Sequence, residues 1–270
     1  MTSPTRTTGG ARPHSSAGWE PRRGAAVIFD IDGTILRPGC RLQRAHMGAM
    51  AAAAAEVTGV PSAFRYRGGD LFVGEHSLSG YTDAGTIELL LRIAGVPREH
   101  RPEQLVRITE TMCRRLAEDV GGLDCRGDLL YGVARLVAEL RSAGVPVGLS
   151  TGNARAVAAC KMGAAGLPGL EARGAFGDHH QAREDIVRDA VAGLRKEAAE
   201  DGRPLEPHDI VLVGDTPSDV RAARAAGIRC LAVATGAATE QLLREAGPDA
   251  LAESLAEVSA ADLMHPAARH

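Results

Sequence analysis

The sequence has few aromatic residues, almost no lysine and no long apolar run. Phe, Tyr and Trp make up 3% of its 270 residues, so aliphatic side chains must fill the core of a chain that is 44% hydrophobic. No stretch approaches the roughly 18 consecutive apolar residues that a membrane-spanning helix needs. The net charge of −3 gives no basic excess for binding nucleic acid. We therefore expect a globular protein of one or two domains with neither membranes nor nucleic acids as partners.

Cysteine is also scarce and scattered. The five cysteines are odd in number and form no C-x-x-C pair; they are Cys40, Cys113, Cys125, Cys160 and Cys230. This argues against a disulfide scaffold or a zinc knuckle and is typical of a reducing compartment. We therefore predict a cytoplasmic protein.

Short apolar runs alternate with helical patterns along most of the chain. The runs, which read as strands buried on both faces, are 25–29, 145–149, 209–213 and 228–233. The helical patterns follow them at 153–165, 183–199, 217–226 and 238–246. Strands that alternate with helices indicate a parallel sheet with right-handed crossovers. The predicted fold class is α/β, with an open parallel-sheet, Rossmann-like core.

Residues 38–124 interrupt this alternation, because they are mostly helical and too long for a single crossover. We interpret them as an inserted α-helical cap domain, with the core formed by 25–37 and 125–258. Residues 1–24 are rich in Thr, Ser, Gly, Pro and Arg, and we predict a disordered extension rather than a transit peptide. Residues 259–270 are expected to be a frayed tail.

Polar residues gather at three of the predicted strand ends. Asp30 and Asp32 follow the first strand, Thr151 follows the second, and Asp215 and Asp219 follow the third. Ligands of open parallel sheets bind at the carboxyl ends of the strands, so these side chains should converge. Carboxylates held together repel one another unless a proton or a cation intervenes. Oxygen ligands without Cys or paired His favour a hard cation, and we predict Mg²⁺.

At this point the chain resembles the haloacid dehalogenase-like hydrolase superfamily, in particular its phosphatase branch with an inserted helical cap. The matching segments are D-I-D-G-T at 30–34, S-T-G-N at 150–153 and G-D-T-P-S-D at 214–219. They follow the family's order, each at a strand end, and the likeness spans roughly residues 25–258. Phosphoglycolate phosphatase-like enzymes are a fair analogy within that branch.

The resemblance implies a role for each of these acids. Asp30 would attack phosphorus to form an aspartyl-phosphate, and Asp32 would protonate the leaving oxygen and later deprotonate water. Thr151 would hydrogen-bond a phosphoryl oxygen. Asp30, Asp215 and the main-chain carbonyl of Asp32 would bind Mg²⁺, with Asp219 supporting that set of ligands.

Two residues compete to supply the positive charge that the family places on the phosphoryl group. Lys161 is one of only two lysines among 31 basic residues, the other being Lys196. Ten residues of helix beyond Thr151 would carry it roughly 15 Å along the axis, away from the strand ends. Arg183 is expected to open a helix on the site's side of the sheet. We favour Arg183 and expect an internal salt bridge for Lys161.

Substrate recognition is predicted to fall to the inserted segment. Its candidate residues are Arg41, Arg65, Arg67, His76 and Tyr81. In G-Y-T-D (80–83), Thr82 or Asp83 is expected to cap a helix that starts near residue 84, although the same motif resembles one that faces the substrate in relatives.

The function predicted from the sequence is Mg²⁺-dependent hydrolysis of a small phosphorylated metabolite. A phosphomutase of the same superfamily is an alternative, since it uses the same two aspartates. A non-catalytic binding module is a further alternative, and the presence of every family acid argues against it.

Overall fold

The computed structural model describes residues 25–67, 70–178 and 180–264, so the predicted disorder of residues 1–24 lies outside the described residues. Its main feature is a six-stranded sheet in the order β6-β5-β1-β7-β8-β9, with every neighbouring pair parallel. The strands are β1 (Ala26–Phe29), β5 (Val147–Thr151), β6 (Gly174–Phe176), β7 (Ile210–Gly214), β8 (Arg229–Val233) and β9 (Ala250–Ala252). The predicted open parallel sheet is confirmed.

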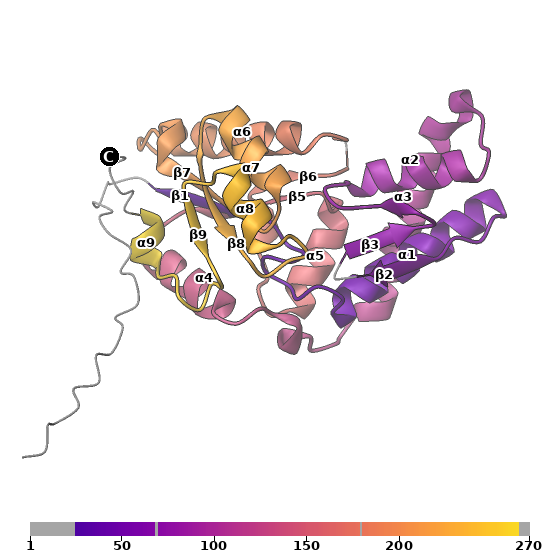
Figure 1. Ribbon diagram of the computed structural model, residues 1–270, viewed down its shortest axis with the longest axis horizontal. Helices are drawn as coiled ribbons and strands as arrows, with labels where there is room; N and C mark the ends of the chain where they lie inside the picture. Colours follow the sequence, from indigo (N-terminus) through magenta and orange to yellow (C-terminus); the bar gives the residue numbers. More distant parts are fainter. Residues whose placement is uncertain (1–24, 68–69, 179, 265–270) are drawn as a thin grey trace, which may run out of the picture.

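Helices cover both faces of this sheet, as Figure 1 shows. Alternate residues of β1 point to opposite faces, so Ala26 and Ile28 belong to one apolar cluster and Val27 and Phe29 to another. The first cluster includes side chains of α6 (Arg183–Glu200), α7 (Pro217–Ala226) and α8 (Glu240–Ala246). The second includes side chains of α4 (Val133–Ser142), α5 (Arg155–Ala164) and α9 (Ala260–Met264). Burial on both faces explains why the strands are uninterrupted apolar runs.

Residues 41–120, between β1 and β5, form a second body of structure beside the sheet (Figure 1). Its helices are α1 (Arg41–Thr58), α2 (Asp83–Ile93) and α3 (Arg101–Val120). It also contains an antiparallel sheet of β2 (Phe64–Arg67), β3 (Asp70–Val73) and β4 (His76–Ser77). The sequence analysis missed this sheet because its strands are short and half exposed, without a clear apolar alternation.

The inserted segment and the core share one continuous apolar cluster. Helix α3 packs against both α1 and α5, and buried residues of all three helices join that cluster. Helix α5 is therefore one element of the core that meets the insertion. The remaining short elements are 3-10 turns at η1 (Arg98–His100), η2 (Arg126–Asp128), η3 (Leu170–Ala172) and η4 (Pro207–Asp209).

The structure corrects two predicted boundaries. The second strand begins at Val147 rather than 145, so Thr151 is the last residue of β5 instead of part of the following loop. The expected frayed tail contains helix α9, in which Leu263 is 1% exposed. Ser259 and Asp262 exchange side-chain-to-backbone hydrogen bonds at the start of α9, a capping box that the sequence analysis overlooked. Residues 265–270 lie outside the described part.

None of the helices in the described part of the chain is both long and apolar enough to cross a lipid bilayer.

Candidate active site

The loop after β1 places two carboxylates at the carboxyl edge of the sheet. Asp30 donates its backbone N–H to Val213 of the neighbouring strand β7. Gly33 has a φ of +93°, and a Cβ there would lie 2.3 Å from an oxygen of Asp215. Thr34 is fully buried and donates its hydroxyl to Asp215 Oδ1 at 3.0 Å. Glycine is thus required by both the backbone conformation and the close approach of Asp215.

Asp30, Asp215 and Asp219 bring one carboxylate oxygen each to within 4.8 Å of one another. Burial raises the pKa of Asp30 to about 6, with repulsion from Asp219 and Asp32 adding to the effect and the Arg183 guanidinium opposing it. Burial, followed by repulsion from Asp30 and Asp219, also raises the pKa of Asp215. Negative charge is therefore in excess at this point.

This acidic cluster fits the predicted divalent ion. All three donors are carboxylate oxygens, the ligand type that Mg²⁺ prefers; Asp30 and Asp215 directly follow neighbouring strands, and Asp219 lies in the first turn of α7. The residual charge also fits, since four aspartates at the site face two cationic side chains, Arg183 and Lys161. Asp30 and Asp215 would hold the metal. Both oxygens of Asp219 already accept hydrogen bonds from Arg183 and Thr216, so Asp219 would support Asp30 and Asp215 rather than bind the metal itself.

Arg183 lies in the acidic cluster at the first residue of α6. Its guanidinium donates two hydrogen bonds to Asp219 Oδ1, at 2.9 and 2.6 Å, and lies 3.0 Å from Asp30 Oδ1. The side chain is 7% exposed. It therefore stands where the sequence analysis expected the phosphate-neutralising charge.

Lys161 also lies in the site, which corrects the expected distance from the strand ends. Its ammonium is 2.7 and 2.9 Å from the two oxygens of Asp32, and the side chain is fully buried. The estimate of 15 Å assumed a helix running back along the sheet. Instead α5 packs against α3 of the insertion, so its middle lies beside the loop that carries Asp32. The expected internal salt bridge is present, but its partner is a proposed catalytic acid.

Asp32 is held apart from the acidic cluster by other partners. Asn153 donates its amide to Asp32 Oδ2 at 2.9 Å, beside the two contacts from Lys161. Burial acts to raise the pKa of Asp32, but the charge and hydrogen bonds of Lys161, the charge of His46 and the hydrogen bond of Asn153 outweigh it and lower the pKa. The two aspartates one residue apart thus occupy opposite electrostatic surroundings.

The end of β5 supplies a hydroxyl group to the same pocket. Thr151 is fully buried and lines the pocket, and its hydroxyl accepts a hydrogen bond from the backbone N–H of Asn153. The hydroxyl of Ser150 and the amide oxygen of Asn153 are buried without a hydrogen-bond partner in the structure. The predicted S-T-G-N segment is therefore at the site, where Asn153 contacts Asp32 through its side chain.

The G-Y-T-D segment joins the insertion to the core. Thr82 is the N-cap of α2 and accepts a hydrogen bond from the N–H of Gly85, which confirms the predicted capping role. Asp83 donates its N–H to the carbonyl of Gly152 and accepts the N–H of Ala154, both at 2.7 Å. Its other oxygen lies 3.2 Å from Nε2 of the buried His46. The sequence analysis missed His46 and this role of Asp83, because their partners are remote in sequence.

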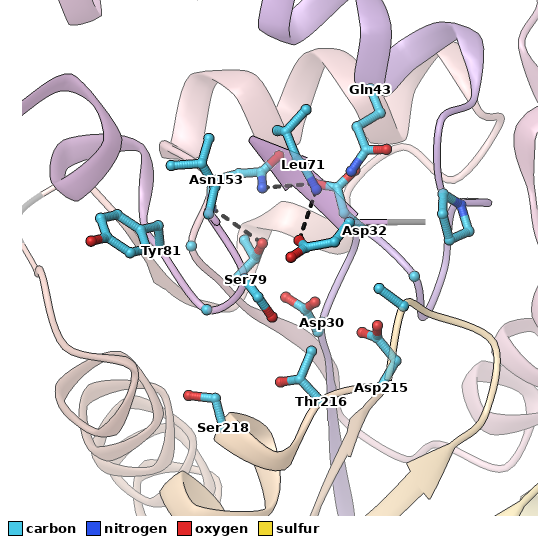
Figure 2. A pocket seen from close by; sticks show the side chains of 18 of the residues that line it. Asp30, Asp32, Gln43, Leu71, Ser79, Tyr81, Asn153, Asp215, Thr216 and Ser218 are labelled. Atoms are coloured by element: carbon cyan, nitrogen blue, oxygen red, sulfur yellow. Dashed lines mark hydrogen bonds between the residues drawn. The ribbon is translucent and has the colours of Figure 1, made fainter. Parts of the chain in front are cut away.

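A pocket of about 160 Å³ lies between these groups and the insertion. Figure 2 shows Asp30 and Asp32 near the centre of the view, with Asp215 and Thr216 below them and Ser79 and Tyr81 to their left. Of the predicted specificity residues, Tyr81 lines the pocket, whereas Arg41, Arg65, Arg67 and His76 are not among its lining residues. Gln43, His46 and Met47 of α1 line it instead.

A larger cleft of about 630 Å³ adjoins this pocket. The two share the Ser79–Tyr81 segment together with Thr216 and Ser218. Three arginines line the cleft, Arg92, Arg101 and Arg221, and Arg101 is paired with Glu88. The approach to the pocket is therefore locally basic in a chain that is acidic overall.

Mg²⁺ is expected to raise the melting temperature more at about pH 7.5 than at about pH 5. The pKa of Asp30 is raised in the folded state from an ordinary 3.8 to about 6, so the metal-free protein loses stability as pH rises through that interval. A bound cation replaces the proton and removes this loss. Thermal unfolding with and without Mg²⁺ at both pH values measures the difference, and equal shifts would contradict it. An Asp215→Asn variant is the control, and in it the Mg²⁺-induced shift in melting temperature should be smaller at both pH values.

Known proteins with similar sequences and folds are consistent with this geometry. A family model described as haloacid dehalogenase-like hydrolase matches residues 25–227. The plasmid-borne protein CbbY of Cupriavidus necator is 29% identical over 225 residues, 75% of each chain. A variant of CbbY from Rhodobacter sphaeroides, in complex with xylulose-(1,5)bisphosphate, has a similar fold (TM-score 0.63, 22% identity, 89% of this chain and 99% of that one).

The β-phosphoglucomutase of Clostridium difficile is also similar in fold. Its TM-score is 0.61 at 16% identity, over 88% of this chain and 94% of that one. At such identities a structural likeness establishes the fold, while the match over residues 25–227 establishes the family.

Proposed function

Because the chain belongs to the haloacid dehalogenase-like hydrolase family, we propose that it is a Mg²⁺-dependent phosphatase that acts on a small phosphorylated metabolite. The observation that carries this proposal is the separation of two neighbouring aspartates. Asp30 lies in the acidic cluster beside Arg183, whereas Asp32 is held outside it by Lys161 and Asn153. One carboxylate is thus placed to attack and the other to transfer a proton.

In the first half of the reaction, an oxygen of Asp30 attacks phosphorus and forms an aspartyl-phosphate. The bond from phosphorus to the ester oxygen breaks, and that oxygen leaves with a proton from Asp32. Thr151 and Arg183 donate hydrogen bonds to phosphoryl oxygens. Mg²⁺ bound by Asp30, Asp215 and the main-chain carbonyl of Asp32 would supply charge neutralisation at the phosphoryl group.

In the second half, Asp32 removes a proton from a water molecule whose oxygen attacks the aspartyl-phosphate. The bond between phosphorus and the Asp30 oxygen breaks, its electron pair returns to Asp30, and phosphate leaves. The ionised form of Asp32, which Lys161 favours, is the form that this half requires.

The inserted segment would act as the cap over this chemistry. Its G-Y-T-D segment is hydrogen-bonded to the loop after β5, and its α1 residues line the pocket from the side opposite Asp30. A cap that covers the pocket in this way would reduce the access of bulk water during phosphoryl transfer. The five free cysteines support the proposed cytoplasmic location.

A screen of metabolite phosphates is expected to show phosphate release that depends on Mg²⁺ and is lost with EDTA. The panel should contain phosphomonoesters with a second anionic group, such as sugar bisphosphates, because the adjoining cleft is lined by arginines. A second reason for including sugar bisphosphates is that the similar CbbY variant was crystallised in complex with xylulose-(1,5)bisphosphate. Activity that is unchanged by EDTA would contradict the proposed metal.

The same screen distinguishes a phosphatase from the alternative function, a phosphomutase. The likeness in fold to β-phosphoglucomutase is the reason for testing this alternative. A mutase would convert a sugar phosphate into its isomer without net phosphate release. Chromatography of the sugar products, run beside the phosphate assay, distinguishes the two outcomes.

A further inference from the structure

The chain has only two lysines, and one of them is buried at the site. Lys161 is 0% exposed, and its ammonium donates to both oxygens of Asp32, at 2.9 and 2.7 Å. A buried ammonium is costly unless it is paired, so this contact is a fixed part of the fold. Arg183, which accompanies Asp30 and Asp219, makes no such contact with Asp32. The two cations thus serve different carboxylates.

The contacts of Asp32 fix its carboxylate in position and in charge. Lys161 reaches both oxygens, and the Asn153 amide donates a third hydrogen bond to Oδ2. Charge-assisted hydrogen bonds of this kind favour the ionised carboxylate and restrict its rotation. Asp32 is 19% exposed, so one side remains open to the pocket that would hold the water. A carboxylate that is oriented in this way and open to the pocket is placed to accept a proton from water.

We propose that Lys161 is a positioning residue that holds Asp32 as the base for hydrolysis of the aspartyl-phosphate. This inference rests on the proposed function. In this step a water proton moves to Asp32, the water oxygen bonds to phosphorus, and the bond from phosphorus to Asp30 breaks with its electron pair returning to Asp30. Lys161 is not among the residues that line the pocket, so its proposed effect on the reaction passes through Asp32.

A single-turnover experiment with an aryl phosphate tests this proposal in the full-length protein with saturating Mg²⁺. An aryl oxygen leaves without needing a proton, so aryl alcohol release reports formation of the aspartyl-phosphate, and phosphate release reports its hydrolysis. In Lys161→Met, alcohol release should stay within about threefold of wild type while phosphate release slows by about 10²-fold, as for loss of a general base. Accumulation of the aspartyl-phosphate is the signature.

Lys196→Met is the matched control, because Lys196 is the other lysine and lies exposed on α6. Both of its rates should equal those of wild type. A merely structural role for Lys161 would instead slow alcohol and phosphate release together, and that result would overturn the proposal. A wild-type protein that releases no phosphate would contradict the proposed function rather than the role of Lys161.

A double variant keeps the proposal testable if Lys161→Met is unstable. Lys161→Met combined with Asp32→Asn removes both charges, so no unpaired carboxylate remains buried. If Lys161 acts through Asp32, the added Lys161→Met change should alter phosphate release by less than about twofold relative to Asp32→Asn alone. A further large loss in the double variant would overturn the proposal.

Discussion

Asp30→Asn is expected to abolish phosphate release, with a loss on the order of 10⁴-fold or more in kcat, because removal of a nucleophile costs about as much as removal of the whole catalytic unit. The amide cannot form the aspartyl-phosphate, whereas the shape of the side chain is kept. The measurement is phosphate release from an aryl phosphate with Mg²⁺. Turnover within tenfold of wild type would contradict the assignment of Asp30 as nucleophile.

The fold should survive this substitution. Asp30 is crowded by Asp219 and Asp32, and its pKa is raised to about 6, so a neutral side chain relieves repulsion at neutral pH. We therefore expect a metal-free melting temperature no lower than that of wild type. Glu184→Gln, in the first turn of α6 but not among the residues that line the pocket, is a matched loss of one acid outside the site and should retain full activity.

Arg183→Met is expected to produce the largest loss of stability among the site variants. Its guanidinium is buried between Asp219 and Asp30, and its removal leaves those carboxylates and Asp215 without their nearest cation. Breaking a buried ion pair on one side costs about 3–5 kcal/mol of unfolding free energy. Denaturant unfolding in EDTA measures the loss, and kcat with Mg²⁺ should fall by about 10²–10³-fold through lost electrostatic stabilisation.

Two further variants define what Arg183 contributes. Arg183→Lys keeps the charge but loses the paired hydrogen bonds to Asp219. The unfolding free energy of this variant should therefore lie between that of Arg183→Met and that of the wild-type protein. Arg188→Met is the control on the same helix, and it removes only an exposed ion pair with Asp185. Its unfolding free energy should stay within about 0.5 kcal/mol of the wild-type value. Wild-type stability of Arg183→Met would contradict the burial argument.

The convergence of the acids followed from local rules. Asp30, Thr151 and Asp215 each come at or just beyond the end of an apolar strand, and parallel strands end at one edge of the sheet. Strand burial could be read directly from uninterrupted apolar runs. The small sheet β2–β4 was missed because half-exposed strands of two to four residues carry little periodic signal.

Lys161 shows where sequence reasoning stops. Its distance along the helix from Thr151 could be calculated, but the direction of α5 could not. That direction is set by packing against α3, which is far away in sequence. The same holds for Asp83, which was recognised as part of a helix start while its bonds to Gly152 and Ala154 were not.

The sequence by itself determined the parallel α/β core and the acids that share its edge, because strand burial and the alternation of strands with helices are encoded locally. Only the tertiary structure decided which cation accompanies which acid: Arg183 with Asp30 and Asp219, and Lys161 with Asp32. The physical reason is that ion pairing depends on distances of a few ångströms between segments that are far apart in the sequence, and the packing of the helices sets those distances.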